Sequence, residues 1–166
     1  MVFARQALVA TLLVAATLWL QGAGMAILIH WARNALGRGM AALQAWRASF
    51  LMIRFTSAIM ALHMSQILLW AVCYRRLCLP SWESSFYFSA TSYSTVGYGD
   101  VVLPPVWRLM GPVESVTGVL MCGISVSALF AILLRLLERE EKQESQRRPV
   151  VAQNQPRAAV SVNEIG

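Results

Sequence analysis

Residues 95–100 read Thr-Val-Gly-Tyr-Gly-Asp, a segment whose backbone oxygens can coordinate a dehydrated cation. Gly97 and Gly99 can adopt positive φ values, which allow successive carbonyl groups to point toward one axis. The Thr95 hydroxyl can add an oxygen, and the intervening side chains turn away to pack behind the segment. Four such segments around an axis can replace the water shell of a potassium ion. The predicted ion-binding residues are Thr95, Val96, Gly97, Tyr98 and Gly99, with potassium ions held at the first four.

The residues before this segment fit a short helix over 82–94. Ser81 is suited to cap its amino end, because a serine hydroxyl accepts a hydrogen bond from a free N–H of the first turn. The carboxyl end of the helix would point at the ion path, where its partial negative charge favours a cation. We therefore expect this helix to position the 95–100 segment.

The composition places these elements in a membrane. Apolar residues make up 57% of the 166-residue chain and charged residues only 13%, whereas soluble domains carry about 25% charged residues. Three stretches, 7–31, 50–74 and 112–137, are long and apolar enough for a helix to cross the hydrocarbon core. The intervening 79–105 is too short and too polar to cross twice, which favours a re-entrant loop. The sequence thus predicts an all-α membrane protein.

The basic residues predict its orientation. Of the 14 Lys and Arg residues, ten fall in the loop after the first span, at the adjoining end of the second span, or from residue 135 onward. Basic residues favour the cytoplasmic side, so we expect a multi-pass protein of the cell (inner) membrane with its N-terminus outside and its C-terminus in the cytoplasm. A cleaved signal peptide is the alternative for the first span, but the apolar run continues through Ile29, beyond the usual signal core.

Two basic segments are expected on the cytoplasmic side. The linker 32–49 has apolar residues at near-helical spacing, typical either of a short helix on the membrane surface or of a helical linker packed on its neighbours. These residues are Leu36, Met40, Leu43 and Trp46. The tail 138–166 alternates charge through Arg148 and then loses periodicity, which predicts a helical extension followed by disorder.

Residues 86–100, with Pro104 and the run Trp107-Arg108-Leu109, resemble the pore module of small bacterial potassium channels of the two-transmembrane ion-channel family. The Thr-Val-Gly-Tyr-Gly sequence is the potassium filter sequence of such channels. The resemblance covers about 50–137 and leaves an extra N-terminal helix, 1–31, outside it, which we expect to be peripheral to the pore module.

The resemblance implies both an arrangement and an activity. The implied parts are an outer helix at 50–74, a pore helix at 82–94, a filter at 95–100 and an inner helix at 112–137. One filter segment cannot surround an ion, so a homotetramer in membrane lipid is implied, conducting potassium passively. Potassium ions in the filter are the only cofactor implied, and no organic cofactor is expected.

Two positions near the filter depart from well-known members of that family. The family's pore-helix glutamate corresponds to Thr91, four residues before Thr95. Tyr87 takes the place of an aromatic residue that hydrogen-bonds the filter aspartate, here Asp100. We expect Tyr87, Thr91 and Asp100 to support the filter, with a hydrogen bond between Tyr87 and Asp100.

Candidate gating residues lie inside the spans. Gly118 and Gly123 are either a hinge, as the family has near this level, or sites of close packing against the outer helix. His63 is a candidate pH sensor, although we favour a neutral histidine hydrogen-bonded between helices. Glu114 can attract cations at the outer mouth, pair with Arg108, or simply be a first-turn acid at a helix start.

Other polar residues leave alternatives open. Thr117, Ser125 and Ser127 either face a water-filled cavity or bond their own helix. Cys73 and Cys78 are spaced so that a disulfide outside the membrane is allowed but not required.

Catalysis and nucleic-acid binding are not expected. The sequence shows no paired carboxylates, triad or phosphate loop, and no basic stripe interleaved with aromatic residues. Three alternatives to a potassium channel stay open: a weakly selective cation channel, a component of a potassium transporter, and a non-conducting accessory or sensor subunit. Transporters with related loops usually carry four per chain, whereas these 166 residues carry one.

Overall fold

The computed structural model describes residues 2–37 and 45–153. The elements are α1 (Val2–Gly37), α2 (Ala45–Leu77), α3 (Trp82–Tyr93), a 3₁₀ helix η1 (Pro105–Trp107) and α4 (Met110–Gln153). No β-strand occurs in these described ranges, which agrees with the predicted all-α fold.

Three helices are long and apolar enough to cross a membrane. The apolar regions are Phe3–Asn34, Ser49–Leu77 and Pro105–Arg135, and each overlaps one of the three predicted spans. The short helix α3 and the irregular segment after it lie between the second and third of them. The chain is therefore an all-α membrane protein with a short helix and loop inserted between two spans.

The long helices run past the predicted span ends. α1 continues to Gly37 and α2 already begins at Ala45, because alanine, leucine and arginine at these ends favour helix beyond the apolar run. The predicted linker 32–49 is shortened accordingly. The side chains on which its surface-helix interpretation depends, and the tail 154–166, lie outside the residues that the structure describes.

The chain divides into two compact units, Met1–Phe130 and Ala131–Gly166. The first unit contains α1, α2, α3, η1 and the first part of α4, and every contact discussed below lies within it. The second unit contains the remainder of α4, which is helical to Gln153 and carries exposed Arg135 and Glu138.

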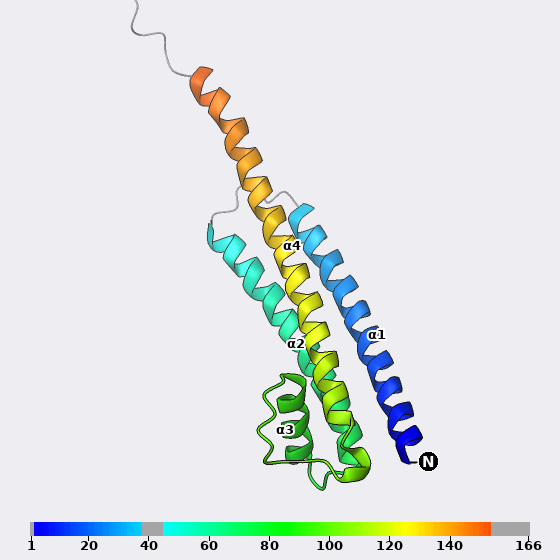
Figure 1. Cartoon of the computed structure of the whole chain (residues 1–166). Helices are drawn as coiled ribbons and strands as arrows, with labels where there is room; N and C mark the ends of the chain where they lie inside the picture. The colour runs from blue at the N-terminus through cyan, green and yellow to red at the C-terminus, as the bar shows by residue number, and fades with distance from the viewer. Residues whose placement is uncertain (1, 38–44, 154–166) are drawn as a thin grey trace, which may run out of the picture. The chain divides into compact units, whose positions relative to one another are not determined.

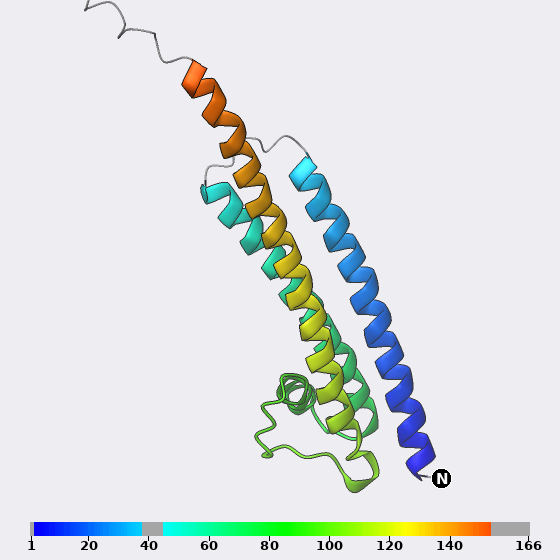
Figure 2. The ribbon, with the colours of Figure 1, turned by 45° about the horizontal axis from the view of Figure 1, so that its top comes forward.

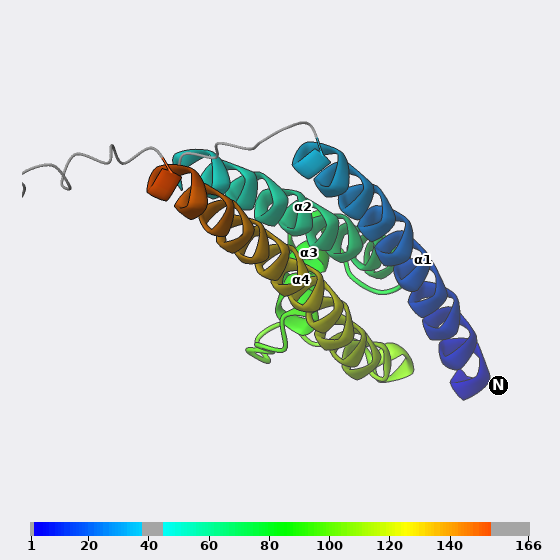
Figure 3. The same cartoon turned by 90° about the horizontal axis from the view of Figure 1, so that it is seen from above.

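Within the first unit, α2 contacts both α1 and α3 (Figure 1). Figure 2 shows the amino end of α1 at the same end of the unit as α3, and Figure 3 shows α1 running alongside α2. A buried cluster of large side chains holds this end together: Trp70, Tyr74, Leu79, Leu103, Trp107 and Met110. Val9, Leu13 and Val14 of α1 pack against that cluster. The first helix, expected to be peripheral, packs along α2 and contacts η1 of its own chain.

Cation–π contacts fasten α1 near both ends. The Arg5 guanidinium lies 5.2 Å from the ring centroid of Trp107, the last residue of η1. Toward the other end, the Arg54 guanidinium of α2 lies 5.0 Å from the Trp31 ring. Such contacts stabilise by about 0.5–1 kcal/mol at exposed sites.

Candidate functional site

The short helix α3 positions the 95–100 segment as predicted. Ser81 caps its amino end, since the Ser81 hydroxyl accepts a hydrogen bond from the Ser84 N–H at 3.1 Å. The helix ends at Tyr93, within one residue of the expected end, and Ser94 caps its carboxyl end. Ser89 in its middle lies against α2, with its Oγ 2.8 Å from the Ile67 carbonyl oxygen.

The backbone after α3 alternates in handedness. Thr95 has φ of 62°, Gly97 of 51° and Gly99 of 79°, and Thr95 is the only non-glycine with positive φ among the described residues. In an extended strand successive carbonyls point to opposite sides. Placing every second residue in the left-handed region turns its peptide around and lets the carbonyls face one side. A β-branched threonine in this region is rare and strained, which is typical of functional segments.

Two backbone hydrogen bonds hold this segment on the end of α3. The Thr95 N–H donates to the Ser92 carbonyl oxygen at 3.0 Å, and the Gly97 N–H donates to the Thr91 carbonyl oxygen at 3.1 Å. The Thr91 hydroxyl instead lies within hydrogen-bond distance of two carbonyl oxygens of its own helix, those of Tyr87 and Phe88, at 3.0 and 3.1 Å. Thr91 therefore contacts the segment through its backbone, not through a side chain behind it.

The 95–100 segment is exposed on the surface of the single chain. Residues 94–100 are all exposed, with Val96 at 53% and Tyr98 at 72% of their full accessible surface. Val96 was expected to pack behind the segment, but about half of its side chain is exposed in the single chain. Tyr98 has one stacking partner, the Tyr87 ring, with centroids 6.4 Å apart and ring planes 15° apart.

The structure contains the predicted hydrogen bond between Tyr87 and Asp100. The Tyr87 hydroxyl donates to Asp100 Oδ2 at 2.8 Å, and the Val101 N–H donates to Oδ1 at 3.0 Å. The hydrogen bond from Tyr87 holds the pKa of Asp100 below its usual value, because it favours the ionised carboxylate.

Tyr87→Phe removes this bond while keeping the ring that stacks on Tyr98. Asp100 should then protonate at a higher pH. In the native chain the lowered pKa keeps Asp100 ionised and bonded to Tyr87 at any pH above the ordinary carboxyl pKa, and this stabilisation is lost as pH falls through the lowered pKa. In the variant the Asp100 pKa is higher, so acid should impair the variant at a higher pH than it impairs the native chain. The measurement is ion flux and its decay over time between about pH 3 and 7. Unchanged conductance, decay and pH profile would argue against a supporting role for Tyr87.

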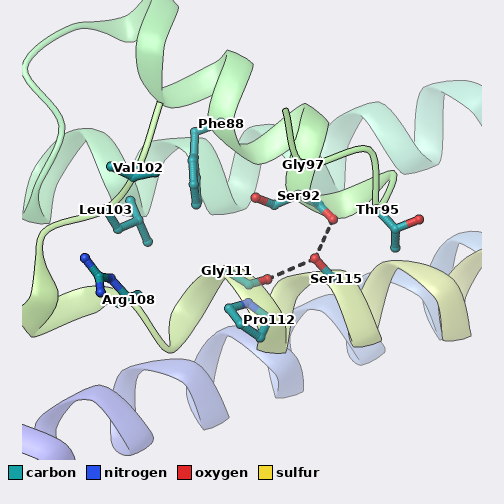
Figure 4. Close-up of a pocket in the computed structure, with 10 residues that line it drawn as sticks. All are labelled: Phe88, Ser92, Thr95, Gly97, Val102, Leu103, Arg108, Gly111, Pro112 and Ser115. Atoms are coloured by element: carbon teal, nitrogen blue, oxygen red, sulfur yellow. Dashed lines mark hydrogen bonds between the residues drawn. The ribbon is translucent and has the colours of Figure 1, made fainter. Parts of the chain in front are cut away.

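A pocket of about 520 Å³ lies between the end of α3, the 95–100 segment and the start of α4 (Figure 4). Its lining residues include Phe88, Thr95, Val102 and Arg108. The Ser115 hydroxyl closes one side by bonding the Ser92 carbonyl oxygen at 2.7 Å, which ties α4 to α3.

α4 lies close against the end of α3 at Gly118. A Cβ at Gly118 would lie 2.2 Å from the Tyr93 carbonyl oxygen, whereas a Cβ at Gly123 would have no heavy atom within 4 Å. The predicted close packing therefore occurs at Gly118, but against the end of α3 and not against the outer helix. α4 is continuous through both glycines, and the hinge stays a prediction.

Glu114 is not at an exposed mouth, and none of the three expectations for it was right. Its side chain is fully buried between α2 and α3. The Tyr74 hydroxyl donates to Glu114 Oε2 at 2.7 Å, and Ser89 Oγ lies 2.5 Å from Oε1. Its position one turn into α4 directs it inward, because Met110 and Thr117 on the same face are also buried.

His63 forms a hydrogen bond between two helices, which is the interpretation that we favoured over a pH sensor. Its Nδ1 lies 2.8 Å from the Tyr93 hydroxyl, which joins α2 to the end of α3. A role in pH sensing stays a prediction.

Three polar side chains of α4 do not share one role. Thr117 and Ser127 donate to carbonyl oxygens of their own helix, at Val113 and Gly123. Ser125 is buried and accepts a hydrogen bond from Gln21 of α1 at 2.9 Å, so it does not face a cavity.

The cysteines are free, which rules out a bridge between Cys73 and Cys78 in this structure. Burial raises the pKa of the Cys78 thiol to about 11, so it is neutral and unreactive near pH 7. Among the described residues, no group of three His, Cys, Asp or Glu side chains is placed to hold a metal.

Sequence reasoning missed several polar residues that position the site, namely Tyr74, Ser89, Gln21 and Gln66. The signal was present, because a polar residue within an apolar span is costly in lipid and usually has a partner inside the protein. Their partners depend on helix packing and could not be read from the spacing.

A family model described as Ion channel matches residues 50–135, just over half of the chain. The match begins in α2 and ends in α4, and it includes α3 and the 95–100 segment. It leaves out α1. Neither the curated proteins nor the solved structures contain a significant match.

Proposed function

Since the chain belongs to the ion channel family, we propose that it is one subunit of a homotetrameric, potassium-selective channel. The observation that carries the proposal is the backbone of 95–99, where positive φ at alternate residues lets the carbonyl oxygens face one side. Oxygens arranged in this way around an axis substitute for the hydration shell of potassium. Passive conduction follows the electrochemical gradient, with ions displacing one another between adjacent sites.

The exposure of the segment supports assembly into a tetramer. Val96 and Tyr98 expose half or more of their surface in a single chain, and one chain supplies one row of oxygens. Four copies around a common axis would cover these side chains and complete the ion sites. The proposed setting is the cell membrane, with the filter reached from outside and the C-terminus in the cytoplasm, following the distribution of basic residues.

Gly97→Ala tests the proposed filter. Alanine at positive φ costs about 1–2 kcal/mol per residue, and a tetramer would incur this cost four times. Potassium flux into liposomes should therefore fall to background in Gly97→Ala and in Tyr98→Ala. Gly22→Ala is the matched control, because a Cβ at Gly22 of α1 would have no heavy atom within 4 Å. Flux that persists in both filter variants at the level of this control would remove 95–99 as the pore.

The alternatives predict different measurements. A weakly selective cation channel would give a reversal potential near zero in opposed potassium and sodium gradients, whereas a selective one follows the potassium gradient. A transporter component or an accessory subunit would give no single-channel steps from the purified protein.

A further inference from the structure

A chain of hydrogen bonds between side chains runs through all four α-helices of the first unit. The Tyr93 hydroxyl at the end of α3 donates to Gln66 Oε1 on α2. Gln66 Nε2 donates to Gln21 Oε1 on α1 at 2.6 Å, and Gln21 Nε2 donates to Ser125 Oγ on α4 at 2.9 Å. His63 Nδ1 bonds the Tyr93 hydroxyl from the other side.

The direction of this chain is self-consistent. The tyrosine hydroxyl has one proton, which it gives to Gln66, so it accepts from His63 Nδ1. Each glutamine then accepts through its oxygen and donates through its nitrogen. The bonds therefore all point the same way, an arrangement in which neighbouring bonds polarise and strengthen one another.

The residues that link the four helices in this chain of hydrogen bonds are buried inside the protein. Gln66 is fully buried, and Gln21, Tyr93 and Ser125 each expose 3% or less of their surface. A buried amide that loses its partner incurs a desolvation penalty, so the arrangement resists displacement of any one helix. Gln21 occupies the middle position, because it receives from α2 and donates to α4.

α1 packs closely against α2 on both sides of Gln21, so a change at Gln21 can be transmitted to α2. A Cβ at Gly24, one turn from Gln21, would lie 2.6 Å from a methyl carbon of Leu62, so the two helices are in close contact there. One turn before Gln21, the Trp70 indole N–H donates to the Thr17 hydroxyl at 3.0 Å. Neither contact reaches α3 or α4. Among the described residues of α1, Gln21 is the one whose hydrogen bonds lead to α4 directly and to α3 through Gln66.

The family match starts in α2 and gives α1 no role. We propose that Gln21 of α1 is a positioning residue for the filter. Through Gln66 it fixes Tyr93, the last residue of α3, and through Ser125 it fixes α4 beside that residue. Tyr93 lies two residues before Thr95, so the position of Tyr93 sets where the filter backbone begins. This proposal rests on the proposed function, because its main effect is on how long the filter stays conducting.

Gln21→Met is the test, with Gln6→Met as the matched control. Both glutamines lie buried on α1, but Gln6 Oε1 has no hydrogen-bond partner. In single-channel recordings of the full chain, Gln21→Met should lower open probability about threefold or more, because it removes both the hydrogen bond from Gln66 and the hydrogen bond to Ser125. Unitary conductance should stay unchanged, because the filter oxygens are untouched. Gln66→Met should behave like Gln21→Met, and the double variant should be no worse than the more affected single one, since both break the same chain.

A second readout separates this proposal from the proposed function. Amide hydrogen exchange of residues 90–99 should become faster in Gln21→Met and not in Gln6→Met, whether or not the protein conducts. A native chain without potassium flux would contradict the proposed function and leave the exchange result to decide the role of Gln21. If Gln21→Met does not assemble, Ser125→Ala, which removes a single oxygen, provides both readouts. Open probability and exchange equal to those of the Gln6→Met control would overturn the proposal.

Discussion

Gly118→Ala is expected to prevent α4 from packing against the end of α3. The added methyl would lie 2.2 Å from the Tyr93 carbonyl oxygen, a backbone atom that cannot rotate away. Either α4 or the end of α3 must shift, and overpacking of this kind costs about 1–3 kcal/mol or more in each subunit. Because Tyr93 lies two residues before Thr95, the shift should also disturb the 95–100 segment. The measurements are the yield and thermal stability of the purified protein and its ion flux, all of which should fall sharply.

Gly123→Ala is the matched control on the same helix. A Cβ there would have no heavy atom within 4 Å apart from its own helix backbone, and alanine favours helix over glycine by about 1 kcal/mol. This variant should assemble at least as well as the native chain. If Gly123 is the hinge, its alanine variant will change gating while assembly is preserved. Gly118→Ala behaving like Gly123→Ala would contradict the close approach of α4 to α3.

Glu114→Ala is expected to destabilise the protein, whereas Glu114→Gln is not. The reason is a count of protons around Ser89. Ser89 Oγ lies within hydrogen-bond distance of two oxygens, the Ile67 carbonyl oxygen and Glu114 Oε1, but a hydroxyl has one proton to donate. Both bonds form if Ser89 donates to Ile67 and the Glu114 carboxyl, carrying a proton, donates to Ser89. The other carboxyl oxygen accepts from Tyr74.

A glutamine reproduces this pattern and an alanine does not. The amide NH₂ can donate to Ser89 and the amide oxygen can accept from Tyr74, so Glu114→Gln should change the free energy of unfolding by less than about 1 kcal/mol. Alanine leaves the Tyr74 and Ser89 hydroxyls buried without that partner and opens a cavity, at a cost of about 3 kcal/mol or more. Thermal unfolding of the detergent-solubilised protein compares the two. Equal losses in both variants would mean that Glu114 is held as a carboxylate.

The parts of the fold that could be predicted depend on local signals. The three spans follow from apolar length, the start of α3 follows from Ser81, and the positive φ of Gly97 and Gly99 follows from their residue type. The hydrogen bond between Tyr87 and Asp100 was predictable because Tyr87 takes the place of an aromatic residue that bonds the filter aspartate in the family that the sequence resembles. Helix ends were less predictable, since α1 and α4 continue where apolar residues give way to good helix formers.

The parts that could not be predicted depend on which faces of the helices meet. Glu114 reads as an outer-mouth acid by position, yet rotation of α4 places it against Tyr74 and Ser89. Gln21 stands beside small residues in the sequence, and its partner on α4 is about a hundred residues away. Each of these side chains was marked by polarity within an apolar span. Partner choice required the tertiary structure.

The open side of the 95–100 segment has a consequence for mixtures of native and altered chains. In the proposed tetramer every copy contributes one quarter of the filter. One altered copy therefore abolishes conduction by the whole tetramer. If native and Gly97→Ala chains are produced in equal amounts and mix at random, roughly one assembly in sixteen is entirely native. The defect would therefore be dominant over the native form in a cell that makes both. A protein acting as a single chain would keep half of its activity in the same mixture.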